Sequence, residues 1–207
     1  MKDIKLVIQE LISSISSYDS LEKGDIDFAC SWISSGAPIF RLDGAAYPDP
    51  HLIVYFVVLD LDQQKILLTD HKKAQLWIPT GGHVEVNEHP MQTVKREVKE
   101  ELGLEAHFLY DKPFFLTVTP TGRMNIRHTD VTLWYLLKGN SLNPPTYYDP
   151  EEFNAVRWFG FDEAIHLNGD PHIHRFLKKL EINKTTLSRK PTRIAENPDF
   201  QDRGLLC

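Results

Sequence analysis

The chain has few of the features that mark secreted, membrane or nucleic-acid-binding proteins. Of its 207 residues only two are cysteines, Cys30 and Cys207, which stand far apart and show no metal-ligand spacing. That usage is consistent with a reducing cytosol, so we expect a cytoplasmic protein. The sequence has no signal peptide and no apolar run of about 18 residues, which argues against a membrane location. A net charge of −6 argues against nonspecific binding of nucleic acid.

Length and composition predict one main domain with additions at both ends. A hydrophobic content of 42% in a chain of this length supports a substantial core, and no internal repeat is visible. We expect a helical N-terminal extension and connector at 1–47, the main domain at 48–182 and a polar C-terminal tail at 183–207.

Hydrophobic periodicity predicts both helices and strands. Apolar residues at helical spacing mark helices within 4–15 and 21–33, and Asp170-Pro171 opens a last helix. Strands are predicted at 51–59, 65–69, 76–78, 106–110, 114–119, 126–138 and 155–161.

A further helix begins at His89-Pro90, because proline is favoured at the first helical position. Its apolar stripe recurs at spacings of three and four on Met91, Val94, Val98 and Leu102. Gly103 ends it, since glycine readily takes the left-handed conformation at a helix C-terminus.

Three carboxylates, Glu97, Glu100 and Glu101, share one face of that helix at spacings of three and four. The face is unfavourable without a partner, because the acids repel and two of them lie in the last turn, where the helix dipole disfavours anions. The alternative is an ordinary solvated face. Lys95 and Lys99 also repel each other, however, so the pattern is not one that stabilises a helix. Clustered carboxylates suit Mg²⁺ or Mn²⁺.

The residues from Gly82 to Leu104 resemble the Nudix box, Gly-x5-Glu-x7-Arg-Glu-U-x-Glu-Glu-x-Gly-U with U aliphatic, at every specified position. The resemblance covers roughly residues 50 to 165. It implies an α+β protein with the Nudix fold, an α/β/α sandwich that holds a mixed sheet, here with a helical N-terminal extension. It also implies a Mg²⁺-dependent hydrolase, with Mn²⁺ as a substitute, that cleaves a diphosphate linkage in a small phosphorylated substrate such as a nucleotide.

The same resemblance implies roles for the box residues. Glu97, Glu100 and Glu101 would coordinate the metal, and one of them or a loop acid would activate the attacking water. Arg96 would orient the carboxylates, and Glu88 would brace the loop and the helix.

The glycines ahead of the box helix are expected to form a loop. Glycine permits positive φ and lets the backbone approach a ligand closely, and in the family this loop presents a backbone carbonyl to the metal, here that of Gly81 or Gly82. Asn87 stands where many members have glycine, and we expect it to keep the left-handed turn.

Outside the box, several residues are weaker candidates. Glu151 and Glu152 precede a predicted strand where many members carry a further base or ligand, and the alternative is two ordinary acids at a turn. His83 and His128 would contact phosphate or hold a carboxylate, unless their role is structural. The aromatic residues that could stack on a base are Tyr147, Tyr148 and Phe115.

The remaining histidines, among them His166, His172 and His174, show no zinc-ligand spacing, so we interpret them as solvated or core-edge residues. Two other function classes are disfavoured. A prenyl-diphosphate isomerase on a related fold would need a catalytic cysteine near the site, and Cys30 and Cys207 are badly placed. A non-catalytic nucleotide sensor would commonly have lost box glutamates, and here they are intact.

The apolar stripe within residues 4–15 is too large to leave in water. We expect it to pack against a second subunit in a homodimer. The alternative is a helix that covers only its own domain.

Overall fold

The computed structural model describes residues 3–42, 48–123 and 126–188. The helices are α1 (Ile4–Ser13), α2 (Ser20–Ser34), α3 (Pro90–Leu102), α4 (Phe161–Ala164) and α5 (Ile173–Ser188). The strands are β1 (His51–Asp60), β2 (Lys65–His71), β3 (Leu76–Ile78), β4 (Thr80–His83), β5 (Phe115–Arg123), β6 (Ile126–Lys138) and β7 (Phe153–Gly160).

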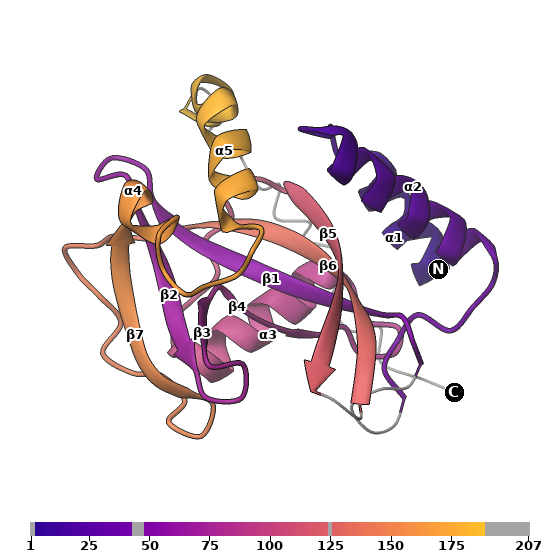
Figure 1. Ribbon diagram of the computed structural model, residues 1–207, viewed down its shortest axis with the longest axis horizontal. Coiled ribbons are helices and arrows are strands. Elements are labelled where there is room, and N and C mark those ends of the chain that lie inside the picture. The colour runs from indigo at the N-terminus through magenta and orange to yellow at the C-terminus, as the bar shows by residue number, and fades with distance from the viewer. Residues whose placement is uncertain (1–2, 43–47, 124–125, 189–207) are drawn as a thin grey trace, which may run out of the picture.

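All seven strands belong to one mixed sheet with the order β3-β2-β1-β6-β5, to which β4 adds by pairing with β1 and β7 by pairing with β2. The long central strands β1 and β6 run parallel, and the other pairs are antiparallel. Figure 1 shows these two strands crossing the middle of the molecule.

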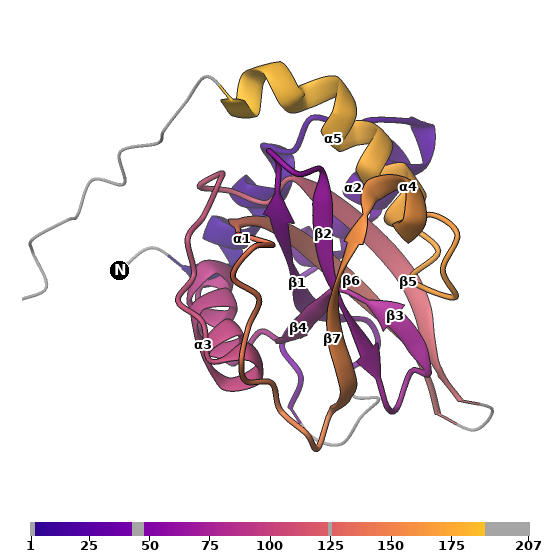
Figure 2. The ribbon, with the colours of Figure 1, turned by 90° about the vertical axis from the view of Figure 1, so that its left-hand side faces the viewer.

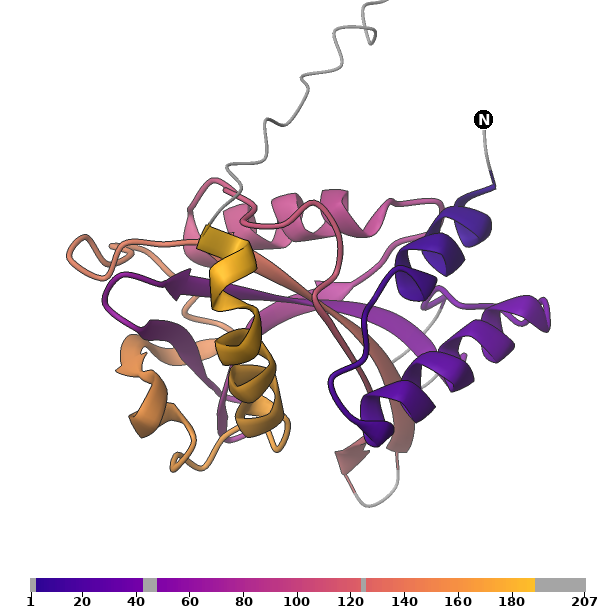
Figure 3. The ribbon, with the colours of Figure 1, turned by 90° about the horizontal axis from the view of Figure 1, so that it is seen from above.

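Helices cover both faces of this sheet. Alternate residues of β1 point to opposite faces, so Leu52 and Val54 join a core with α1, α2 and α3, whereas Val57 and Leu59 join a second core with α4 and α5. Figures 2 and 3 show α3 on one side of the strands and α5 on the other. The arrangement confirms the predicted α+β class and the sandwich around a mixed sheet.

The N-terminal helices share the core of the sheet. Ile8 and Ile12 of α1 are fully buried in the first core. The helix α2 also reaches α5, because the carboxylate of Glu22 accepts a hydrogen bond from Lys179 Nζ at 2.6 Å and both side chains are buried. The apolar stripe that suggested a homodimer is therefore covered within the chain.

The predicted strand at 106–110 is wrong. Only Phe108 bridges to Leu137, and the backbone bends away beyond it, so this segment touches β6 without forming a ladder. The strand predicted to end at 119 instead continues through Pro120 to Arg123. Proline is tolerated there because β5 is the last strand in the sheet order, with one free edge.

At the C-terminal side, α5 crosses the expected boundary between 182 and 183 and continues to Ser188. The rest of the predicted tail, with Cys207, lies outside the described residues. Within the part of the chain that the structure describes, none of the helices combines the length and apolarity needed to cross a bilayer.

Candidate functional site

The helix α3 is capped as its sequence predicts. Pro90 stands in the first turn, and His89 caps the helix by accepting a hydrogen bond at Nδ1 from the backbone N–H of Met91 (3.1 Å). At the other end Gly103 has a φ of 64° in the left-handed region. Asn87 also has a positive φ, 63°, which confirms that it keeps the turn before the helix.

Arg96 is the centre of a hydrogen-bond network that holds the loop against α3. Its guanidinium donates from Nε to Glu88 Oε1 (3.1 Å), from Nη2 to Glu88 Oε2 (3.0 Å) and from Nη1 to Glu97 Oε1 (2.6 Å). Nη2 also lies 3.3 Å from the carbonyl oxygen of His83 in β4. Glu88 accepts a further bond from Thr93 Oγ1 at 2.7 Å. Arg96 thus links the carboxylate of Glu88 to that of Glu97 on α3.

The glycines of β4 allow its backbone to lie close to groups of β1 and α3. The predicted loop at 80–82 is wrong, because Thr80, Gly81 and Gly82 pair with β1 as a strand, and the positive φ expected of the glycines is absent from these described residues. A Cβ at Gly82 would lie 2.0 Å from Glu97 Oε1, and one at Gly81 would lie 1.9 Å from the carbonyl oxygen of Val54. Strand β4 therefore packs directly against the box carboxylate.

The three box glutamates have unlike surroundings. Glu101 is 6% exposed, and burial raises the pKa of its carboxyl to about 9. Burial also raises the pKa of Glu97, although Arg96 offsets part of that effect. Glu100 is 61% exposed and its Oε2 lies 3.6 Å from Arg96 Nη1. All three lie on one side of α3, and their exposure to solvent decreases in the order Glu100, Glu97, Glu101.

An acid from the loop before β7 reaches the same region. Glu152 and Asp149 both raise the pKa of Glu101 electrostatically, after burial and Glu97, so both lie near it. Asp149 also donates its backbone N–H to the carbonyl oxygen of Glu101 at 2.8 Å. Glu151 is exposed. Of the two acids named from the sequence, Glu152 is the one that acts electrostatically on the box, and its Oε1 also lies 3.5 Å from Lys73 Nζ.

A second group of polar side chains gathers around His51 at the start of β1. Its ring centroid lies 5.0 Å from that of His83 and 4.9 Å from that of His128. Asp130 completes the group, with Oδ1 3.0 Å from His51 Nε2 and 3.4 Å from His128 Nε2. His51, which the sequence did not single out, therefore has the rings of both His83 and His128 close to its own.

The aromatic candidates do not gather there. Phe115 is fully buried against Trp134 and Phe176, so the hypothesis that it stacks on a base is wrong. Tyr148 donates its hydroxyl to the carbonyl oxygen of Asn154 at 3.2 Å, and Tyr147 lies over Gly103 at the end of α3. None of the contacts described for Tyr147 or Tyr148 reaches His83 or His128.

The residues that sequence reasoning missed are His51, Asp130 and Asp149. The sequence contained a signal for Asp130. His128 and Asp130 are two residues apart on one predicted strand, so their side chains lie on the same face of the sheet. Finding His51 needed the parallel register that pairs it with Asp130, which the linear sequence does not state.

Comparison with known proteins agrees with this geometry. Residues 49–180 match the family model described as NUDIX domain. The chain is 28% identical over 96 residues to the asymmetrical bis(5'-nucleosyl)-tetraphosphatase of Mus musculus, covering 44% of this chain and 60% of that protein. The Sus scrofa enzyme of the same name is 31% identical over 101 residues, with the same two coverages. The chain thus spans about 60% of the length of the curated relatives it matches.

Solved structures show the same fold. A NUDIX-family hydrolase from Clostridium perfringens is 24% identical, with a TM-score of 0.50, over 64% of this chain and 97% of that one. The NUDIX domain of Shewanella oneidensis NrtR, solved with ADP ribose, is 16% identical, with a TM-score of 0.53, over 74% of this chain and 97% of that one. With the family match across most of its length and the braced box helix, this chain belongs to the NUDIX domain family.

Proposed function

We propose that this protein is a divalent-metal-dependent hydrolase that cleaves a diphosphate linkage in a nucleotide-type substrate, with Mg²⁺ or Mn²⁺ as its ion. The observation that carries the proposal is Glu101. Its Oε2 is buried and lacks a hydrogen bond of good geometry among the described residues, beside the carboxylates of Glu97 and Glu152, and the nearby Thr80 hydroxyl offsets only part of the rise in its pKa. A buried anion among anions is unfavourable unless a cation compensates it. These donors are hard oxygens, so they fit Mg²⁺.

In this proposal Glu97, Glu100 and Glu101 hold the ion, with the carbonyl of Gly82 and the carboxylate of Glu152 as further oxygen donors. When bound, such an ion supplies positive charge for the phosphate oxygens and lowers the pKa of a coordinated water. Arg96 fixes Glu97 through the 2.6 Å bond, and Glu88 fixes Arg96.

For the substrate, we propose a bis(5'-nucleosyl) tetraphosphate as the first class to test. The support is the name shared by the two curated relatives. Nucleoside triphosphates and nucleoside diphosphate derivatives such as ADP-ribose are the other classes. The chain carries a net charge of −6, so we expect weak binding of any polyphosphate without a divalent ion.

A hydrolysis screen tests the proposal. Purified full-length protein is incubated with each substrate class and with Mg²⁺, Mn²⁺ or a chelator, and released phosphate, pyrophosphate and nucleotides are measured. We expect activity that chelation abolishes and that Glu101→Gln lowers by orders of magnitude. Glu105→Gln is the matched control, because Glu105 is exposed and pairs only with Lys99 in the described contacts. Equal activity in Glu101→Gln and the wild type would remove the assignment.

Metal binding has a second readout. An ion that binds only the folded state raises the melting temperature by mass action. We expect Mg²⁺ and Mn²⁺ at millimolar concentration and low salt to raise the melting temperature of the wild type and to have much less effect on Glu101→Gln. A melting temperature that neither ion changes counts against the proposal.

The alternative chemistry of an isomerase gains no support from the structure. Cys30 lies in α2, where its sulfur contacts Ser13 Oγ at 3.6 Å, on the extension rather than beside the box. A cytoplasmic location and the lack of nucleic-acid and membrane partners stay predictions from composition.

A homodimer also stays a proposal, now with a different surface. The stripe of α1 is buried, but Leu6, Leu21 and Phe28 on the two N-terminal helices are each about half exposed. We propose that these exposed apolar residues of α1 and α2 contact a second copy. Light scattering on the full chain should give a dimer that Phe28→Glu dissociates, with Leu142→Glu as the control. A wild-type monomer would refute the idea.

A further inference from the structure

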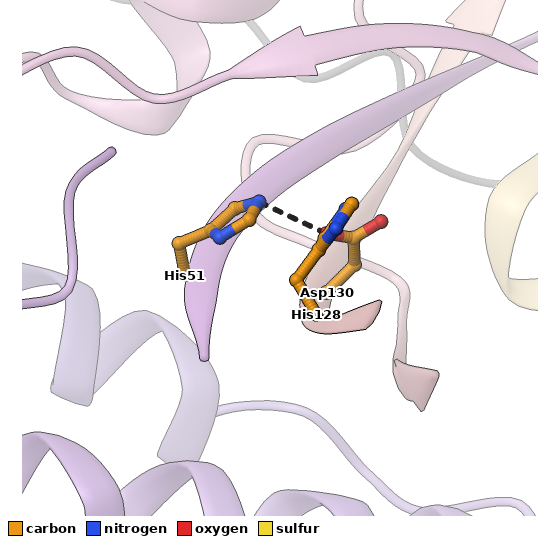
Figure 4. Close-up of side chains that lie close together, drawn as sticks. All are labelled: His51, His128 and Asp130. Atoms are coloured by element: carbon orange, nitrogen blue, oxygen red, sulfur yellow. Dashed lines mark ion pairs between the residues drawn. The ribbon is translucent and has the colours of Figure 1, made fainter. Parts of the chain in front are cut away.

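The group formed by His51, His128 and Asp130 is built like a metal site. Each offers one ligand atom, and these atoms lie within 4.8 Å of one another. Among the described residues it is the single group of three or more His, Cys, Asp or Glu side chains with that geometry. Figure 4 shows the His51 ring on β1 facing Asp130 and His128 on the neighbouring strand.

The tautomer of His51 leaves a lone pair directed at Asp130. A carbonyl can only accept, so Nδ1 of His51 donates to the Pro48 carbonyl oxygen at 2.9 Å. In the neutral ring Nε2 is then unprotonated, and it lies 3.0 Å from Asp130 Oδ1. His51 is fully buried, and neither Nε2 nor Oδ1 makes a hydrogen bond of acceptable geometry. Two electron-rich atoms this close need either a proton or a metal ion between them. Burial lowers the pKa of His51, and its contacts with Asp130 and the Pro48 carbonyl more than offset that effect, so the pair favours a positive charge at this position.

Both atoms are also held in place by hydrogen bonds on their far sides. The Pro48 carbonyl fixes the ring of His51, and Thr121 Oγ1 donates to Asp130 Oδ2 at 2.9 Å, which leaves Oδ1 facing the histidines. Supporting bonds of this kind, from the second ring nitrogen and the second carboxylate oxygen, are what orient metal ligands in proteins.

The two separations that involve Asp130 agree with a small coordination sphere. Metal–nitrogen and metal–oxygen bonds of about 2.0–2.1 Å at tetrahedral angles separate ligand atoms by roughly 3.3 Å. Here Asp130 Oδ1 lies 3.0 Å from His51 Nε2 and 3.4 Å from His128 Nε2. We propose that these three residues bind a late first-row divalent ion, for which Zn²⁺ is the probe. Two imidazoles and one carboxylate suit such an ion better than Mg²⁺.

His83 does not complete the sphere. Arg41 Nη1 lies 3.1 Å from its Nδ1 and 3.2 Å from its Nε2, so a cation already occupies the neighbourhood of that ring. The group therefore offers three protein ligands, and a tetrahedral ion bound there would take its fourth ligand from water or an anionic oxygen, as in catalytic rather than structural zinc sites. It adjoins the Nudix box through β4, because the carbonyl oxygen of His83 contacts Arg96.

The inference does not depend on the proposed hydrolysis, so binding is measured directly. Full-length protein is treated with a chelator, transferred to buffer with excess Mg²⁺ and titrated with Zn²⁺ by calorimetry. A parallel titration with Co²⁺ reads the visible bands of a low-coordinate ion. We expect one ion per chain, and binding about 100-fold or more weaker in Asp130→Asn and in His128→Ala.

Two controls separate this site from others. Glu101→Gln should bind Zn²⁺ as the wild type does, because it alters only the box carboxylates. His166→Ala, at an exposed histidine outside the group, should also bind normally. Asp130→Asn keeps the side-chain shape, so it reports on binding if His128→Ala fails to fold.

Three results would overturn the proposal. One is a wild type that binds no Zn²⁺ in the presence of Mg²⁺. Another is undiminished affinity in Asp130→Asn. A third is ring-nitrogen NMR in which His51 carries two protons and does not respond to Zn²⁺, because the pair is then an ordinary imidazolium–carboxylate contact.

Discussion

Gly82 lies directly against the carboxyl group of Glu97, so close that a methyl group on its Cα would fall 2.0 Å from Glu97 Oε1. That same oxygen accepts the 2.6 Å hydrogen bond from Arg96. The glycine of the box, the first glutamate of its acidic face and the arginine between them are thus a single packed unit.

Gly82→Ala should therefore damage activity more than stability. The obstructed atoms belong to the flexible end of Glu97, which can rotate away and lose its bond to Arg96 while β4 stays paired. We expect turnover to fall by about 100-fold, the effect of misplacing a catalytic group by roughly 1 Å. Kinetics and thermal unfolding measure the two effects. Gly81→Ala is the matched variant, because its Cβ would strike the Val54 backbone and should lower stability more. Wild-type turnover in Gly82→Ala would contradict this account.

Arg96→Lys tests the brace. Lysine keeps the charge but cannot donate two parallel bonds to Glu88 while a third reaches Glu97. Arg96 is 28% exposed, so we expect a loss of about 1–2 kcal/mol in the free energy of unfolding. A double-mutant cycle with Glu88→Gln should show strong coupling, and Lys99→Arg, at an exposed surface pair, should change little. Additive effects of Arg96→Lys and Glu88→Gln would show that the bonds do not act together.

Much of the box helix could be predicted from the sequence, because its features depend on residues that are close together in the chain. The spacing of Glu97, Glu100 and Glu101 on a helix, the proline that begins it and Gly103 that ends it all follow from one periodicity. The same holds for Asn87, whose left-handed turn depends only on its neighbours in the chain.

The features that the sequence did not predict depend on contacts between segments that are far apart in the chain. The His51 group exists only because β1 and β6 run parallel in a register that sets His51 beside Asp130. The glycines of β4 looked like a loop because glycine disfavours strands, yet tertiary packing against Glu97 and Val54 requires them. The segment around Phe108 had the composition of a strand, but it makes only a single bridge to β6.

Asp170 should make stability depend on pH. Burial raises the pKa of its carboxyl to about 6, from an ordinary value of 3.8. The folded state therefore holds the proton more tightly than the unfolded state. The stabilisation that this provides is complete below about pH 4 and is lost as pH rises through 6.

Asp170→Asn removes this titration and keeps an oxygen for the hydrogen bond from the backbone N–H of His172, which is 2.7 Å in the structure. The side chain is partly accessible, so we expect a gain of about 1–2 kcal/mol over the wild type at pH 8 and little difference at pH 4. Urea unfolding across that range measures it, with Asp162→Asn at an exposed position as control. A stability difference that does not change with pH would contradict the assignment.

A buried ion pair joins the N-terminal extension to α5. Lys179 Nζ lies 2.6 Å from Glu22 Oε1, and the two side chains are 4% and 0% exposed. Glu22 also accepts bonds from the backbone N–H groups of Tyr18 (2.6 Å) and Leu116 (3.4 Å), so three segments meet at one carboxylate. Lys179→Met removes the cation and leaves a buried charge uncompensated, which typically costs about 3–5 kcal/mol.

The double variant Lys179→Met/Glu22→Gln should recover part of that loss, because no charge remains and the amide oxygen still accepts one of the two backbone bonds. Chemical unfolding of the three proteins decides the matter, and Lys23→Met, at an exposed ion pair in α2, is the control. If Lys179→Met is as stable as the wild type, this ion pair contributes nothing to attaching the extension, which then depends on apolar packing and on other contacts such as Arg175 with Asp19. If instead the double variant is no better than the single one, lysine acts through the packing of its alkyl chain and not through its charge.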